Sequence, residues 1–333
     1  MTPMSQHQRS ILASLLRSPA VGAAALLAIF LVAPLLVSGY HVFQLTQLVV
    51  YALALLGLNL LTGFTGQVSL GHGAFYALGA YVTAILLAQG STPYWLIPVP
   101  VAGVCFVVGW LFGRTAARLE GIYLALATFA LAIAMPQFLK LDALQRWTGG
   151  SQGVSVGKPS SPLPELITDD RWLYYFCLLV AALLFAATWN VVRGRTGRAL
   201  LALRDHPIAA AAMGIDVAAY RSATFGVSAM LTGVAGGLGA VLAGYISPDS
   251  FSNLLSIQLL VGSVIGGIAS IFGTIFGAAF IELVPDLASK LSSAAPWAIY
   301  GVLLIVCMMA MPAGVAGLLQ SARARLARIS RQS

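Results

Sequence analysis

Long apolar stretches, separated by short polar ones, follow one another along almost the whole chain. Many of these stretches are about 20 residues long, which is the length that an α-helix needs to cross the hydrocarbon core of a bilayer. A membrane β-barrel would instead show segments of about 10 residues with alternating polarity, and the chain lacks that pattern. The sequence therefore predicts an all-α fold, a polytopic bundle of membrane-spanning helices.

The apolar pattern predicts about ten spans. They cover residues 21–37, 43–61, 69–88, 94–112, 122–139, 172–192, 222–243, 254–272, 274–287 and 296–318. The span at 274–287 is short and contains Pro285, Glu282 and Asp286. An alternative is eight spans with a re-entrant pair of segments, which is also an even number and also leaves both termini on the same side of the membrane. In either case residues 21–318 form one transmembrane domain, between an N-terminal tail at 1–20 and a basic tail at 319–333.

Composition agrees with membrane insertion. Hydrophobic residues make up 59% of the chain and charged residues only 8%, whereas a soluble domain carries about 25% charged residues. The net charge is +8, and basic residues lie in the short loops between apolar spans, where they orient a protein in the bilayer. The composition thus predicts contact with lipid and no nucleic-acid partner.

The distribution of basic residues predicts the orientation, because cytoplasmic loops collect Arg and Lys. With the N-terminus inside, 13 of the 18 basic residues fall on the inner side. These are Arg9, Arg17, Arg114, Arg118, Arg193, Arg195, Arg198, Arg204, Arg221, Arg323, Arg325, Arg328 and Arg331. The longest outer loop, residues 140–171, has four basic and four acidic residues. Both termini and the loop 193–221 are therefore predicted to be cytoplasmic.

A glycine-rich polar segment interrupts the helical pattern at residues 63–75. Exposed backbone is not tolerated in hydrocarbon, so such a break must be buried in protein or line a watery path. A broken helix that forms a transport path and a plain cytoplasmic turn are both open interpretations, and a packed, hydrogen-bonded His72 is favoured over a proton carrier or ligand. The candidate path residues are Gly63, Thr65, Gly66, Gln67, Ser69, Gly71 and His72.

Glycines also recur at a spacing of four in the later spans. The pairs are Gly233 with Gly237, Gly262 with Gly266, and Gly273 with Gly277. Small residues at this spacing let helix backbones approach closely, so these pairs predict close helix packing. The run at residues 266–273 also resembles the break near Gly66 and hints at an internal repeat.

The predicted cytoplasmic loop 193–221 contains two short helices. Residues 199–203 favour helix, Pro207 suits a first helical turn with Asp205 near its N-terminus, and Gly214 is a plausible C-cap. The second helix has a small, smooth face made largely of alanines. Such a face either fits a groove on a partner protein or lies on the lipid headgroups.

Two recognisable patterns for nucleotide and metal binding are absent from the sequence. There is no P-loop or HExxH motif, and the three cysteines, Cys105, Cys177 and Cys307, lie in apolar runs without paired spacing. No cofactor or metal site is predicted. Glu282, Asp286 and Lys290 are spaced four apart and are interpreted as a surface ion-pair ladder, so the two rival classes, an ion-coupled secondary transporter and an intramembrane enzyme, find little support.

Three longer motifs resemble a known family. Residues 57–75, 121–128 and 148–153 are similar to the branched-chain amino acid ABC transporter permeases, and the loop at 148–153 to the M type of subunit. Residues 197–214 resemble the cytoplasmic coupling region of that family, although Ala209–Ala212 stand where many ABC importer permeases carry a glutamate before the alanines.

The resemblance implies a function and a set of partners. The chain would be one permease subunit of an ATP-driven importer in a bacterial inner membrane, beside a second homologous permease, two ATP-binding cassette subunits and a periplasmic solute-binding protein. ATP would be hydrolysed on other chains, and the cargo would be a branched-chain or related hydrophobic amino acid. The residues implied in coupling to the ATPase are Arg204, Asp205, Pro207, Ala210, Ala211 and Gly214.

Overall fold

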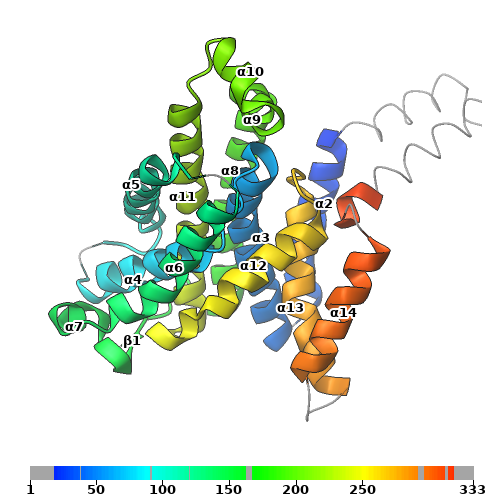
Figure 1. The fold of residues 1–333 in the computed structure, drawn as a ribbon. Coiled ribbons are helices and arrows are strands. Elements are labelled where there is room, and N and C mark those ends of the chain that lie inside the picture. Colours follow the sequence, from blue (N-terminus) through cyan, green and yellow to red (C-terminus); the bar gives the residue numbers. More distant parts are fainter. Residues whose placement is uncertain are drawn as a thin grey trace, which may run out of the picture.

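The computed structural model describes residues 19–37, 39–90, 92–119, 121–162, 167–291, 296–311 and 314–318. The two predicted tails, apart from residues 19 and 20, lie outside the described residues. The described chain is almost entirely helical (Figure 1). The longer helices are α2 (Pro19–Leu36), α3 (Tyr40–Thr65), α4 (His72–Ala88), α5 (Pro98–Ala116), α6 (Ile122–Leu139), α8 (Asp169–Arg193), α9 (Arg195–Asp205), α11 (Val217–Ala243), α12 (Asn253–Gly266), α13 (Gly273–Leu291) and α14 (Pro296–Ala310).

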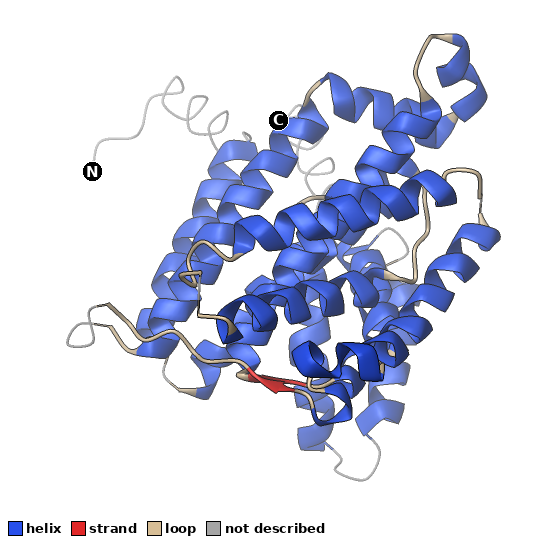
Figure 2. Cartoon of the chain, turned by 90° about the vertical axis from the view of Figure 1, so that its left-hand side faces the viewer, coloured by secondary structure: helices blue, strands red, loops and turns tan. Residues whose placement is uncertain are grey.

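Short elements lie in the loops. They are α7 (Gln145–Thr148), α10 (Pro207–Ala212), the 3₁₀ turns η1 (Asp142–Leu144), η2 (Gly150–Gln152) and η3 (Pro248–Phe251), and the strands β1 (Val154–Ser155) and β2 (Tyr245–Ile246). The two strands pair antiparallel, with Val154 opposite Ile246 and Ser155 opposite Tyr245. This small sheet is the red element in Figure 2.

The helices α3 and α11 form the centre of the bundle. Most residues of both helices are buried, whereas α5, α6 and α8 leave most of their apolar residues uncovered by the chain. An apolar surface of this extent is stable only against lipid or another apolar partner. The predicted all-α membrane bundle is confirmed in this form.

Helix length separates the ten predicted spans into two groups. Within the part of the chain that the structure describes, six stretches are long and apolar enough to cross a membrane, namely α3, α5, α6, α8, α11 and the stretch Ile299–Leu318. Of the helices in the other four predicted spans, α2 has 18 residues, α4 has 17, and α13 carries Glu282, Asp286 and Lys290. The helix α12 has only 14 residues, about 21 Å at 1.5 Å per residue, against a hydrocarbon core of about 30 Å. The chain is polytopic, and helix length alone does not fix the number of crossings.

Glycines create the closest helix contacts, as their spacing predicts. In the α12–α13 pair, Gly266 lies against the backbone of Gly273, and Gly277 against that of Gly262. In the centre, Gly79 of α4 lies against the backbone of Gly233 in α11. A side chain at any of these positions would overlap main-chain atoms, which cannot move aside without moving a helix.

Two features mark opposite ends of the bundle in both views. The helices α9 and α10 project at one end, and the β1–β2 sheet lies at the other (Figures 1 and 2). At the sheet end, Lys140 donates a hydrogen bond to Asp249 over 2.6 Å, which joins the loop after α6 to the loop after α11. The chain thus returns to the same end after each of these helices.

We expect Gly79→Leu to destabilise the protein, because a leucine side chain cannot fit against the Gly233 backbone and overpacking typically costs about 1–3 kcal/mol or more. The measurement is the melting temperature of the purified protein in detergent. Gly103→Leu is the matched control, because an added side chain there meets nothing within 4 Å. Equal melting temperatures for the two variants would contradict the packing of α4 on α11.

Candidate translocation and coupling site

The connection between α3 and α4 is a buried break. The helix α3 ends at Gly66, whose φ of 72° is left-handed, a conformation that glycine adopts without strain. Of the seven residues predicted to line a path, six are buried, and only Gly66 is exposed. The segment is therefore inserted among helices and is not an exposed turn.

Side chains from neighbouring helices satisfy the backbone of this break. The Leu70 N–H donates to Thr128 Oγ1 of α6 at 2.9 Å, and the Gly73 N–H donates to Ser256 Oγ of α12 at 3.0 Å. These amides belong to the first turn of α4 or precede it, where a helix has no partners of its own. Hydroxyl groups thus replace the water that hydrocarbon excludes.

His72 lies at the centre of a directed chain of hydrogen bonds. Ser228 Oγ donates to the Gly57 carbonyl at 2.6 Å, so it accepts from His72 Nε2, which lies 2.6 Å away. On the other side, Ser69 Oγ accepts from the Gly71 N–H and is left to donate to His72 Nδ1 at 2.9 Å. One ring nitrogen donates and the other accepts, which is the pattern of a neutral imidazole. The packed, hydrogen-bonded interpretation of His72 agrees with this geometry.

A second break lies beside the first. Between α12 and α13 the backbone turns through Gly267, with φ of 111°, and Ala269, with φ of 61°. Asn59 of α3 holds this turn: its side-chain oxygen accepts from the Ala269 N–H at 2.9 Å, and its amide donates to the Ser270 carbonyl at 2.8 Å. Gly63 lies against Ala269, so the two glycine-rich segments that resemble each other in sequence meet in space.

Arg204 joins the first break to the predicted coupling region. Its Nη1 donates to the Gly63 carbonyl at 3.0 Å, its aliphatic stem lies against Gly66, and its Nε donates to Asp205 at 3.0 Å. Arg204 is the penultimate residue of α9, directly before α10. The structure therefore brings two sets of predicted residues together through one side chain.

The helix α10 begins and ends as the sequence predicts. Pro207 occupies its first turn, and Gly214 follows it in the left-handed region, with φ of 85°. Ala210, however, is buried within the chain, so a substitution there would disturb the fold before it disturbed a partner. The exposed knob consists instead of Ile208, 88% exposed, Met213, 84% exposed, and the alanines around Ala211.

The predicted ion-pair ladder is present only in part. Asp286 and Lys290 form an ion pair of 2.8 Å. Glu282, half-buried on the same helix, takes part in no ion pair among the described residues. Within the same part of the chain, no group of three His, Cys, Asp or Glu side chains is placed to hold a metal ion.

Four residues essential to this geometry were not predicted as site residues: Asn59, Thr128, Ser228 and Ser256. Each is an uncharged polar residue inside a predicted span, and each is buried. Their polarity at these positions is the signal that sequence analysis could have used, because a polar side chain inside a membrane normally has a partner within the protein.

Comparison with known proteins defines the class of protein first. The family model described as "Branched-chain amino acid transport system / permease component" matches residues 40–312, which include both breaks and the coupling region. The fold and this match identify a polytopic transport permease. The chain belongs to this family of branched-chain amino acid transport permeases, as the resemblance implied.

Individual relatives agree with the M type. The chain is 31% identical over 287 residues to the high-affinity branched-chain amino acid transport system permease protein LivM of Salmonella typhimurium, covering 79% of this chain and 67% of that protein. It is 30% identical to LivM of Escherichia coli over the same shares. LivH of Escherichia coli is 27% identical, with 80% of this chain and 91% of LivH covered. No solved structure matches the chain.

We expect Asn59→Ala to destabilise the protein strongly, because it leaves the Ala269 N–H and the Ser270 carbonyl without their partner and each buried unsatisfied group costs about 1–3 kcal/mol. The measurement is thermal unfolding in detergent. Asn190→Ala, at an exposed position of α8, is the control and is expected to melt like the wild type. An unchanged melting temperature for Asn59→Ala would show that Asn59 does not hold the second break.

Proposed function

We propose that the chain is the M-type permease subunit of an ATP-driven importer that carries branched-chain or related hydrophobic amino acids. Its partners are a second homologous permease, two ATP-binding cassette subunits and a periplasmic solute-binding protein, and its place is a bacterial inner membrane. The observation that carries this proposal is the exposed α10 knob, which Arg204 connects to the buried break between α3 and α4. The names of the LivM and LivH relatives support the substrate class.

The proposed topology has ten spans with both termini in the cytoplasm. The helices α9 and α10 lie at one end of the bundle, and α9 carries Arg195, Arg198 and Arg204. The β1–β2 sheet, which includes part of the predicted outer loop of zero net charge, lies at the other end. The Lys140–Asp249 ion pair places the two predicted outer loops together. In this topology the short helices α4 and α12 span the membrane together with the non-helical residues of the buried breaks that adjoin them.

In the proposed mechanism, ATP-driven movement of a partner displaces α10 and with it α9. Arg204 transmits the displacement to the Gly63 carbonyl and to the backbone at Gly66. Because Asn59 connects α3 to the second break, the pairs α3–α4 and α12–α13 shift together and expose the path alternately to each side. The predicted residues from Gly63 to His72 act in this proposal as a hinge beside the path.

An ion-coupled secondary transporter is the alternative function. It would use an ionisable side chain inside the membrane, and the half-buried Glu282 of α13 is the residue that it would use. Family membership favours the ABC importer. Uptake that persists after deletion of the ATP-binding subunits would favour the alternative.

The topology is tested by cysteine labelling. We expect Ser151→Cys to react with an impermeant thiol reagent only from outside intact spheroplasts, and Ala212→Cys only in inside-out vesicles, because both positions are exposed at opposite ends of the bundle. The labelling background is set by the parent protein, in which Cys105 and Cys177 are buried. Labelling of both cysteines from one side would overturn the orientation.

The coupling role of α10 is tested by charge. We expect Ile208→Glu, Ala211→Glu and Met213→Glu each to abolish co-purification of the ATP-binding subunits and ATP-dependent uptake of leucine, since a charge stranded in an apolar contact typically costs several kcal/mol. Ser151→Glu, exposed at the other end, is the control. Each variant is first checked for normal membrane insertion and melting. Normal co-purification and uptake in all three variants would contradict this role of α10.

A further inference from the structure

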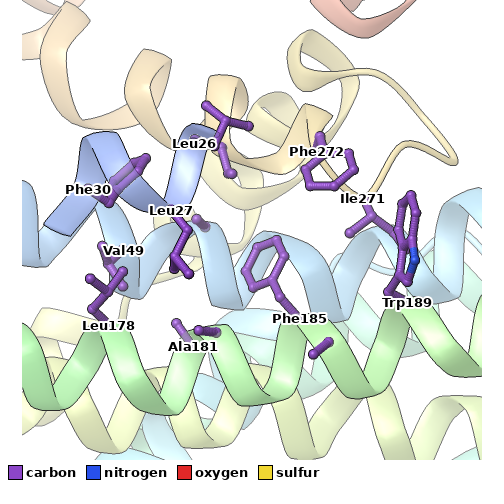
Figure 3. Close-up of a pocket in the computed structure, with 14 residues that line it drawn as sticks. Leu26, Leu27, Phe30, Val49, Leu178, Ala181, Phe185, Trp189, Ile271 and Phe272 are labelled. Carbon is purple, nitrogen blue, oxygen red and sulfur yellow. The ribbon is translucent and has the colours of Figure 1, made fainter. Parts of the chain in front are cut away.

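An apolar cavity of about 380 Å³ lies between α2, α3, α8 and the segment that leads into α13. Figure 3 shows Leu26, Leu27 and Phe30 of α2 along one side of it and Leu178, Phe185 and Trp189 of α8 along the other. All fourteen lining residues are Ala, Val, Leu, Ile, Phe or Trp. A zwitterionic solute is a poor occupant, because the wall offers no charged group to an ammonium or a carboxylate, and burying an unpaired charge is very costly. The cavity suits a hydrocarbon chain.

The surroundings of this cavity are apolar as well. Leu179 and Leu183 of α8 and Ile29 of α2 are 58%, 63% and 63% exposed, so the rim continues into surfaces that face lipid in a membrane protein. The Tyr174 hydroxyl donates to the Phe30 carbonyl at 2.6 Å and holds α2 to α8 at one end of the cavity. Leu26 and Leu27 line the cavity further along α2, toward Trp189 (Figure 3).

Positive charge lies at the Trp189 end of the cavity. The Trp189 ring packs on Phe272, with ring centroids 5.1 Å apart, and the Arg193 guanidinium lies 3.9 Å above the same Trp189 ring. Arg193 is exposed at the end of α8, and Arg195 and Arg198 follow it at exposed positions of α9. Guanidinium groups bind phosphate through paired charged hydrogen bonds, and basic residues next to the membrane attract anionic lipids.

We infer that this cavity is a site for an anionic phospholipid, with one acyl chain between α2 and α8 and the phosphodiester beside Arg193. The site depends only on membrane insertion and not on which face is cytoplasmic. Ile271 and Phe272, which line the cavity, follow directly after Ser270, whose carbonyl Asn59 holds. The bound chain therefore contacts the residues that directly follow the second break.

The test uses the complete transporter complex in nanodiscs made with acyl-brominated lipids, and it measures quenching of Trp189 fluorescence. The Trp189 contribution is the difference between the wild type and Trp189→Phe. We expect brominated phosphatidylglycerol to quench this contribution at least twofold more than brominated phosphatidylcholine. We expect Arg193→Gln to remove the preference, and Ala182→Phe, which fills the cavity, to remove most quenching by both lipids.

Two matched controls accompany these variants. Arg114→Gln removes a similar contact, since the Arg114 guanidinium lies 5.6 Å from the Trp110 ring centre, and Leu183→Phe enlarges an exposed neighbour of Ala182. Both are expected to keep the preference for phosphatidylglycerol. Equal quenching of Trp189 by the two lipids would overturn the headgroup assignment. Absence of quenching by either lipid would show that a protein helix, such as one of the second permease, covers the cavity, and would overturn the site.

Discussion

The whole arrangement depends on one constraint: a helix that is interrupted inside a membrane must find protein partners for its free backbone groups. The described residues contain two such interruptions, and polar side chains from other helices form hydrogen bonds with each of them. Thr128 and Ser256 accept from the amides around the first, and Asn59 both donates to and accepts from the second. These few hydrogen bonds therefore determine which helices are neighbours, since any other arrangement would leave the breaks without partners.

The same bonds make the breaks a mechanical unit. Asn59 belongs to α3, one turn before Gly63, whose carbonyl accepts from Arg204. A displacement at the end of α9 thus reaches the first break directly and the second through a single helical turn. The glycines of both breaks keep backbone in contact with backbone at this point, and a close-packed contact transmits movement because it has no slack to absorb it.

Much of the fold could be predicted from sequence, because an apolar run of membrane length has few alternatives to a helix. The glycine pairs also indicated where helices touch, and the cap residues Pro207 and Gly214 fixed α10 correctly. The partners of the breaks could not be predicted. Asn59 and Ala269 are 210 residues apart, and nothing local shows that an isolated asparagine in one span pairs with a turn in another.

The helix α10 also shows a limit of prediction from sequence. Alanines at 209–212 indicated a small face, but helical geometry turns successive residues through 100°, so one of the four, Ala210, is buried against the chain itself. The neighbouring apolar residues Ile208 and Met213 are 88% and 84% exposed. Exposed apolar side chains at the end of a bundle indicate a surface for contact with another molecule.

The hydrogen bonds of His72 at the first break bear on whether this site is driven by proton transfer or by displacement of helices. Both nitrogens of His72 form hydrogen bonds with serine hydroxyls: Nδ1 accepts from Ser69, and Nε2 donates to Ser228 of α11. Protonation of Nδ1 would leave the Nε2 bond to α11 in place. It would, however, take away the acceptor of the Ser69 hydroxyl proton in a buried site, although Ser69 Oγ could still accept from both the ring and the Gly71 N–H. The observed hydrogen bonds therefore favour the neutral ring. The break is built to stay neutral while it moves, which suits a site that is driven by displacement of attached helices and not by proton transfer.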